Sequence, residues 1–470
     1  MRGIARIDGQ TDLHGGSLAR RNAAAIALFV GTFAACLLVA PREVNGDGIG
    51  YIKAAKDGAL YPGHLAYLPL LRAAWHAAVA LGLCGTRLAD AVWPGRVLSA
   101  LGAGAAATLL YLVIERRDGV RPALVAGVGL AASACLLGAG CDLESYAPAL
   151  AALLGVVWAL ERDRVTLGAL LLALATLLHV ENALFGLAAL TLTRSRGKLV
   201  AVAAGTTLAA YLASGMLTSL PRASHGFAYP LHAYTPLVAV WGALRALVFV
   251  PYPYEASLVH VVATTVVAVA FAVLLRPARS LVRSLLFAWL VPYALVGVVF
   301  FPSDPERWIF VLPLVWLMAR PRAIVVALLA VVNLALWLPH ARDARGLDAA
   351  SRAATHLAPH DLVLMPGHGW DESLALLADD VRPFPFVYHA AARGGAGGLG
   401  VALDEALRTR GRVVSVRLDG DDVATDVSDT LGYKELSRWG LDRAALRELL
   451  RAHGLFPAGS LGDGVTLWTR

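Results

Sequence analysis

Residues 23–40 read AAAIALFVGTFAACLLVA, a run that contains no charged side chain. A transmembrane helix needs about 20 predominantly apolar residues to cross a hydrocarbon core of about 30 Å. This run is therefore long enough to cross most of a bilayer. Four arginines precede it and no small-residue cleavage pattern follows it, so we interpret it as a retained first span and not as a removed signal peptide.

The composition of the whole chain agrees with that interpretation. Of 470 residues, 58% are hydrophobic and only 16% are charged, whereas soluble proteins carry about 25% charged residues. The net charge of +7 comes mainly from arginines in the loops between apolar runs. Such a distribution indicates membrane topology and not nucleic-acid binding. We expect a polytopic α-helical membrane protein whose surroundings are a lipid bilayer.

Ten further apolar runs bring the predicted number of spans to about eleven. Residues 65–83 are not among them, because Arg72 and His76 interrupt that run and favour a helix lying in the membrane interface. The ten runs cover residues 97–114, 123–140, 147–160, 165–178, 182–193, 199–220, 256–275, 284–303, 308–319 and 323–339.

Basic residues predict the orientation of these spans. Alternate loops hold dense Arg and Lys clusters, such as Arg116 and Arg117, and the positive-inside rule places those loops in the cytoplasm. The alternation requires residues 165–193 to form a hairpin that turns at 179–181. We therefore expect a multi-pass protein of the inner or plasma membrane, with a cytoplasmic N-terminus and a periplasmic or extracellular C-terminus.

The chain divides into three parts. Residues 1–22 form the cytoplasmic N-terminus, residues 23–340 form a transmembrane domain with a long first outer loop at 41–96, and residues 341–470 form an external domain. In that last part strand-like runs alternate with helical runs, which predicts a small α/β domain. The strand-like runs are 361–365, 384–389, 412–417 and 464–469, and the helical runs are 371–378, 399–408 and 441–453.

A glycine-rich stretch, RGGAGGLG at residues 393–400, contains a formal GxGxxG pattern. A dinucleotide site needs these glycines directly after a strand, and here several residues intervene. We expect a flexible loop. The four cysteines show neither CxxC nor Cys/His spacing, which argues against a disulfide framework or a zinc site.

Ionisable residues gather in four stretches that this topology places on the outer face. Three of them have a simpler explanation beside a functional one. Asp47 lies in a Gly-Asp-Gly turn signal, and Glu144 precedes a span, where a carboxylate is often solvated or favoured at a helix N-terminus. Arg307 has Asp304 and Glu306 as local partners. The stretches are 42–75, 140–150, 177–185 and 300–314.

The order of these fragments resembles the GT-C superfamily of membrane glycosyltransferases, which use polyprenyl-phosphate-linked sugars. The branch it is most similar to is the bacterial one related to protein O-mannosyltransferases. Two departures from that pattern are Leu65-Ala66 in place of Pro-Pro and a single Asp in place of an Asp-Glu pair. The matching fragments are Asp47-Gly48, residues 62–70, Arg96 with the small residues after it, Glu144-Ser145-Tyr146, His179 and Glu306-Arg307-Trp308.

This resemblance implies a hexosyltransferase that moves a sugar from a polyprenyl-phosphate donor to a hydroxyl of a protein, lipid or glycan. We expect Asp47 to act as general base, Glu144 to be a second carboxylate, and Arg307 to bind the lipid phosphate. No cofactor is expected, and a divalent metal is not indicated. Residues expected to bind substrate are Tyr51, His64, Tyr146, His179 and Glu181.

Two other classes remain open. A transporter or lipid-linked-sugar flippase would place ionisable residues at mid-membrane depth and repeat interrupted helices in its two halves. A non-catalytic scaffold that presents the C-terminal domain would not need acidic residues in three separate loops. The sequence shows no such internal repeat, and its polar stretches lie at one face, which favours the transferase.

Overall fold

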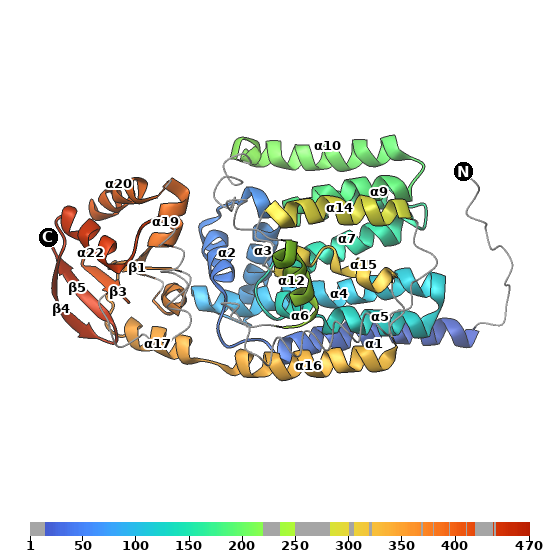
Figure 1. Ribbon diagram of the computed structural model, residues 1–470, viewed down its shortest axis with the longest axis horizontal. Helices are drawn as coiled ribbons and strands as arrows, with labels where there is room; N and C mark the ends of the chain where they lie inside the picture. Colours follow the sequence, from blue (N-terminus) through green and yellow to red (C-terminus); the bar gives the residue numbers. More distant parts are fainter. Residues whose placement is uncertain are drawn as a thin grey trace.

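The protein is a bundle of helices with a small sheet-containing domain at one end (Figure 1). A computed structural model describes its architecture. Most helices of the bundle run side by side, and the chain's C-terminus lies in the small domain. The described residues are 15–219, 236–249, 283–299, 305–318, 322–367, 370–378, 380–393, 395–409, 411–418, 436 and 439–470.

The length and apolar composition of several helices suggest a membrane protein. Among the described residues, four helices are long and apolar enough to cross a membrane, or five if one bent pair counts as a span. The helices of the bundle are α1 (Gly15–Leu38), α4 (Val92–Asp118), α5 (Val120–Ala132), α6 (Ala134–Cys141), α7 (Tyr146–Leu160), α8 (Val165–Leu178), α9 (Phe185–Leu192), α10 (Arg196–Ser214), α12 (Pro236–Leu247), α14 (Arg283–Val299), α15 (Leu312–Met318) and α16 (Ala323–Arg342).

The prediction of about eleven spans is wrong for the part of the chain that the structure describes. Helices α7 and α8 have 15 and 14 residues, which at 1.5 Å per residue reach roughly 21 to 23 Å, less than a bilayer core of about 30 Å. The predicted span at 182–193 divides into η3 (Val180–Leu184) and the short helix α9. The predicted span at 256–275 lies outside the described residues.

A break at Ser133 divides one predicted span into α5 and α6, which meet at 62°. A broken helix leaves backbone groups that need partners, above all in lipid. The side chain of Asn333, buried in α16, supplies them. Its Nδ2 donates to the carbonyls of Ala132 (2.6 Å) and Leu247 (2.7 Å), and its Oδ1 accepts from the amide of Phe249 (2.8 Å). One polar side chain thus forms hydrogen bonds with backbone carbonyls at the C-terminal ends of α5 and α12.

The segment expected as the first outer loop, residues 41–96, is mostly helical. It forms α2 (Gly46–Asp57), η1 (Pro62–His64), α3 (Tyr67–Ala80) and η2 (Leu88–Ala91). Asn45 caps α2 by accepting a hydrogen bond from the amide of Gly48 (2.6 Å), and Gly58 ends it with φ +70°, the usual arrangement of both helix ends. The helix expected over 65–83 is present as α3. Its position relative to a membrane stays a prediction.

The C-terminal part is the small α/β domain that the sequence predicts. Its five-stranded sheet has the order β2-β1-β3-β5-β4, in which β1, β2 and β3 are parallel and β4 and β5 are antiparallel neighbours. The strands are β1 (Leu362–Met365), β2 (Arg382–Pro385), β3 (Val413–Val416), β4 (Phe456–Gly462) and β5 (Val465–Thr469). The helical elements are α17 (Arg345–Ala354), η7 (Trp370–Ser373), α18 (Leu374–Leu377), α19 (Phe386–Arg393), α20 (Ala396–Leu407) and α22 (Arg443–Ala452).

Three details of this domain differ from expectation. The run at 384–389, expected as a strand, ends β2 at Pro385 and continues as helix α19. Strand β4 was not expected, since its sequence FPAGSLG has no regular alternation of apolar and polar residues. The glycine-rich stretch is not a flexible loop: Gly395, with φ +101°, starts helix α20. Because a helix precedes it, this stretch lacks the strand that a dinucleotide site requires.

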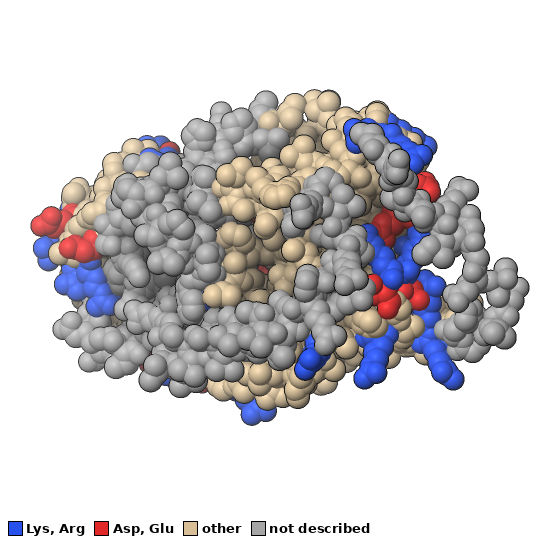
Figure 2. Space-filling model, turned by 45° about the vertical axis from the view of Figure 1, so that its right-hand side comes forward, with Lys and Arg blue, Asp and Glu red and all other residues tan. Residues whose placement is uncertain are grey.

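Lys and Arg side chains gather at the end of the bundle that faces away from the C-terminal domain (Figure 2). Two ion pairs join neighbouring helices there, Arg21 with Glu115 (2.9 Å) and Arg117 with Glu161. A charged end beyond apolar helix flanks is typical of membrane helices. Which compartment this end faces stays a prediction.

Candidate functional site

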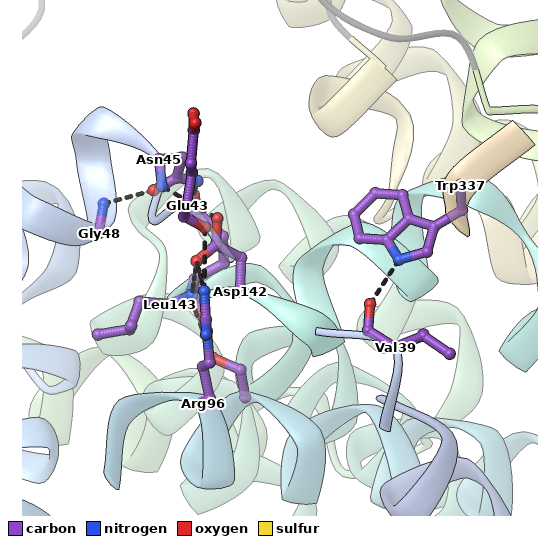
Figure 3. Close-up of polar contacts among 10 residues, drawn as sticks. Val39, Glu43, Asn45, Gly48, Arg96, Asp142, Leu143 and Trp337 are labelled. Carbon is purple, nitrogen blue, oxygen red and sulfur yellow. Dashed lines mark hydrogen bonds and ion pairs between the residues drawn. The ribbon is translucent and has the colours of Figure 1, made fainter. Parts of the chain in front are cut away.

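The segment that leads into α2 is hydrogen-bonded to the loop between α6 and α7 (Figure 3). The amide of Asn45 donates to Oδ2 of Asp142 (3.1 Å), and its side-chain Nδ2 donates to Oε1 of Glu144. Asn45 thus joins two acidic residues while it caps α2. The segment before α2 and the loop between α6 and α7, distant in sequence, meet at this point.

A buried arginine completes the attachment. Arg96, in the first turns of α4, donates from Nη2 to the carbonyl of Glu43 (3.0 Å) and lies 3.9 Å from Oδ1 of Asp142. The side chains of Arg96 and Asp142 are only 12% and 11% exposed, so each charge depends on the other. Arg96 was matched to the family pattern, but Asn45 and Asp142 were not predicted as site residues, although both lie inside the acidic stretches.

Glu144 lies inside the protein, with 2% of its surface exposed. Ser99 holds its backbone, exchanging hydrogen bonds with the Glu144 amide and carbonyl (both 3.1 Å). Among the described residues, the second carboxyl oxygen, Oε2, is buried without a hydrogen-bond partner. Burial raises the pKa of Glu144 well above its usual range, and the nearby charge of Glu306 raises it further. The carboxyl is therefore neutral over a wider pH range than an exposed glutamate.

Asp47 has the opposite environment. It occupies the first turn of α2 and is exposed, at the helix end where acidic side chains are commonly found. The structure places it in a helix and not in an isolated turn. Its charge also contributes to raising the pKa of Glu144. Two carboxyl groups with contrasting environments therefore lie within electrostatic reach of each other.

Four of the predicted substrate-binding residues form one group, the histidine–tyrosine cluster. The ring centroids of His64 and His179 are 5.0 Å apart, and those of Tyr146 and His179 are 4.6 Å apart. The hydroxyl of Tyr51 lies 3.3 Å from Nε2 of His64. Phe310 extends the cluster toward the fourth stretch, 5.1 Å from His179. The structure thus brings together side chains from all four acidic or polar stretches.

Hydrogen bonds fix the ring of His64 within this cluster. Its Nδ1 lies 3.2 Å from the carbonyl of Leu178 and 3.0 Å from Oγ of Ser145. A tautomer protonated on Nδ1 donates to that carbonyl and leaves Nε2 to accept from Tyr51. Ser145 was part of a matched motif but was not predicted to contact the cluster.

The remaining two predicted residues lie at the edge of this region. Glu181 belongs to η3, directly after His179, and is half-buried. Arg307 belongs to η6 (Pro305–Trp308), next to Glu306, and its side chain lies outside the described part of the structure. Among the described residues, no group of three or more His, Cys, Asp or Glu is arranged to hold a metal ion.

No family model matches the sequence, and no curated protein is similar to it in sequence. The structure is similar to that of ArnT from Cupriavidus metallidurans in the apo state, with 12% identity and a TM-score of 0.44 over 95% of this chain and 98% of that one. The same protein bound to undecaprenyl phosphate gives 13% identity and a TM-score of 0.42, over 96% and 97% of the two chains. This similarity is too low to decide an activity or a substrate.

Proposed function

We propose that this protein is a GT-C type glycosyltransferase that moves a sugar from a polyprenyl-phosphate donor to an acceptor hydroxyl at the membrane surface. The observation that carries the proposal is that exposed Asp47, in the first turn of α2, lies within electrostatic reach of buried Glu144, whose carboxyl group accepts a hydrogen bond from Asn45, the N-cap residue of that helix. The histidine–tyrosine cluster lies beside the pair. Aromatic rings and hydroxyls of this kind suit a sugar, which presents both apolar faces and polar edges.

The reaction we propose is a single displacement. The acceptor oxygen forms a bond to the anomeric carbon while the bond from that carbon to the phosphate oxygen breaks. Asp47 takes the acceptor's proton as general base, an assistance typically worth about 10²–10⁴ in rate. Polyprenyl phosphate leaves with the bonding electron pair. Glu144, kept neutral by burial, donates a hydrogen bond to donor or acceptor, in the manner of other buried carboxylic acids.

Arg307 is the residue we assign to the leaving phosphate, because it lies in η6 next to Glu306, whose charge reaches Glu144. A guanidinium binds phosphate bidentately, which an ammonium does not. We predict that Arg307→Lys raises the KM for the donor by about tenfold or more, because one charge-assisted hydrogen bond to the phosphate is lost. The KM for the acceptor should stay unchanged. Equal effects on both substrates would contradict this role.

The direct test is donor consumption by the purified chain in lipid nanodiscs. The probes are short-chain polyprenyl-phosphate mannose, glucose and galactose, each labelled in the sugar, and the product measured is free polyprenyl phosphate. We expect Asp47→Asn to lower the rate by about 10²–10⁴ and to keep the thermal midpoint of the parent. Asp57→Asn, at the far end of the same helix, is the matched control. Near-normal turnover by Asp47→Asn would remove Asp47 as the base.

A flippase is the second candidate, and the 62° break between α5 and α6 is the observation that favours it. Interrupted helices often form transporter sites. Vesicles that contain labelled polyprenyl-phosphate sugar on one face distinguish the two functions. A flippase moves intact donor between faces, whereas the proposed transferase consumes the donor and releases polyprenyl phosphate.

A further inference from the structure

The C-terminal domain packs directly on the segment that forms α2 and η2. Element η7 lies against α2, and α18 lies against η2. Ala375 of α18 belongs to the main apolar core of the helical bundle, and Leu376 packs on that core. The two domains therefore share a hydrophobic interface, and the carboxyl end of β1 leads into the segment that reaches α2.

Glu372 is the residue of η7 that reaches the helix carrying Asp47. Its carboxylate occupies the space where a side chain at Gly46 would stand, so a methyl group built on Gly46 would overlap it. Tyr388, from α19, donates its hydroxyl hydrogen to Oε1 of Glu372 (2.7 Å) and orients the carboxylate. Glycine at position 46 allows this approach. A carboxylate at the first turn of a helix interacts favourably with the exposed amides there.

Lys53 lies on the same side of α2 as Gly46 and Glu372. Positions 46 and 53 are seven residues apart, two helical turns, and so share a face. Burial lowers the pKa of Lys53, and the charges of Asp57 and Glu372 act against that shift. The Glu372 carboxylate therefore lies within electrostatic reach of Lys53 as well as against Gly46.

The segment just before α2 also contacts the C-terminal domain through its own side chains and backbone. Oε1 of Glu43 accepts a hydrogen bond from the amide of Leu347 (2.9 Å), in the first turn of α17. The amide of Arg42 donates to the carbonyl of Ala341 (3.0 Å). Each domain thus places a carboxylate at the first turn of a helix of the other. The residues just before Asp47 are held by both domains.

We propose that the C-terminal domain takes part in the candidate site through Glu372, a positioning residue that fixes the first turn of α2 and thereby the carboxylate of Asp47. This inference rests on the proposed function for its catalytic consequence. Its structural part, the support of α2 by Glu372, holds for any activity of Asp47. The C-terminal domain is then part of the enzyme's working geometry and not an appended module.

The test uses the full chain in nanodiscs and two readouts, amide hydrogen exchange over residues 41–58 and steady-state kinetics with the donor. Glu372→Gln removes the charge, and Gly46→Ala displaces the flexible carboxylate. We expect both to speed exchange in the first turn of α2 by about two- to fivefold. We expect kcat to fall by about tenfold or more with an unchanged donor KM, because small misplacement of a catalytic group is costly.

Two compensating changes in side-chain size distinguish a loss of positioning from a general loss of stability. Glu372→Asp shortens the side chain and makes room for the methyl group of Gly46→Ala, so the double variant should regain part of the kcat that Gly46→Ala loses. Glu405→Gln is the matched control, since Glu405 forms an exposed pair with Arg393 in the same domain (2.7 Å).

The proposal is overturned if α2 exchanges in Glu372→Gln and Gly46→Ala as it does in Glu405→Gln. It is also overturned if exchange rises but kcat of an active parent stays the same. If the parent consumes no donor, the proposed function fails, and the exchange readout alone decides whether Glu372 supports α2.

Discussion

Polar contacts of the same chemical kind occur in two very different places in this molecule. Around Asn45, a carboxylate and a guanidinium meet inside the protein, where Arg96 and Asp142 are nearly excluded from solvent. On the C-terminal domain, Arg393 and Glu405 form a closer pair, 2.7 Å apart, but are 40% and 50% exposed. Although the exposed pair is closer, stability depends more on the buried pair. Water can replace either partner of the exposed pair, whereas it cannot replace a partner in the buried one.

The largest effect should come from breaking the buried pair. Arg96→Ala leaves Asp142 buried without its opposing charge, and we expect it to lower the free energy of unfolding by about 3–5 kcal/mol. The measurement is the thermal midpoint of the purified chain in detergent. Arg96→Met combined with Asp142→Asn removes both charges and should recover most of the loss. A single Arg96→Ala variant as stable as the parent would show that the buried charge has another partner.

A smaller, pH-dependent effect should follow from replacing Glu144. Because burial raises its pKa in the folded state, folding favours the protonated carboxyl. Its contribution to stability is complete below the unfolded pKa of about 4.3 and is lost as the pH rises through the folded pKa. Glu144→Gln cannot ionise, so its stability relative to the parent should increase with pH by up to about 1.4 kcal/mol per pH unit in that window.

Thermal midpoints of parent and Glu144→Gln between pH 4 and pH 9 provide the check. Glu405→Gln serves as control, because its pairing with Arg393 lowers the pKa of Glu405. Above its ordinary titration range that variant should show no such slope. A constant difference between parent and Glu144→Gln across the range would mean that Glu144 titrates like an exposed residue.

The smallest effect should come from the exposed pair. Arg393→Ala removes a partner that solvent can replace, and we expect the thermal midpoint and the donor kinetics to stay within the scatter of the parent. A clear loss of stability would show that α19 and α20 depend on this contact. It would also weaken the contrast between buried and exposed pairs.

Much of this architecture could be predicted from short-range sequence patterns. Apolar runs predicted α1, α4, α10 and α16, since length and hydropathy suffice for long helices. The same patterns could not distinguish a short buried helix such as α9 from a span. They also failed at residues 384–389, where an aromatic-rich apolar run suits strand and helix equally well.

For the candidate site, the sequence predicted the loops that form it more successfully than it predicted the contacts between them. Asp47 and Glu144 came from acidic loops assigned to one face. Asn45 was missed because a neutral cap residue resembles any turn asparagine. Glu372 was missed because its contact with Gly46 joins two domains, and no local periodicity records a partner so distant in sequence. Their detection required the packing of α2 against η7.

Asn333 has a consequence for how the protein is made. Its side chain donates to the carbonyl of Ala132, 201 residues earlier in the chain. While the ribosome is still producing the intervening segments, the broken end of α5 lacks that donor. Unsatisfied backbone groups are costly in a bilayer, so this end must be held by water or by the insertion machinery until α16 arrives. Helix α16, late in the chain, therefore completes the end of α5, early in the chain, and we expect a chain truncated before Asn333 to be degraded instead of maturing.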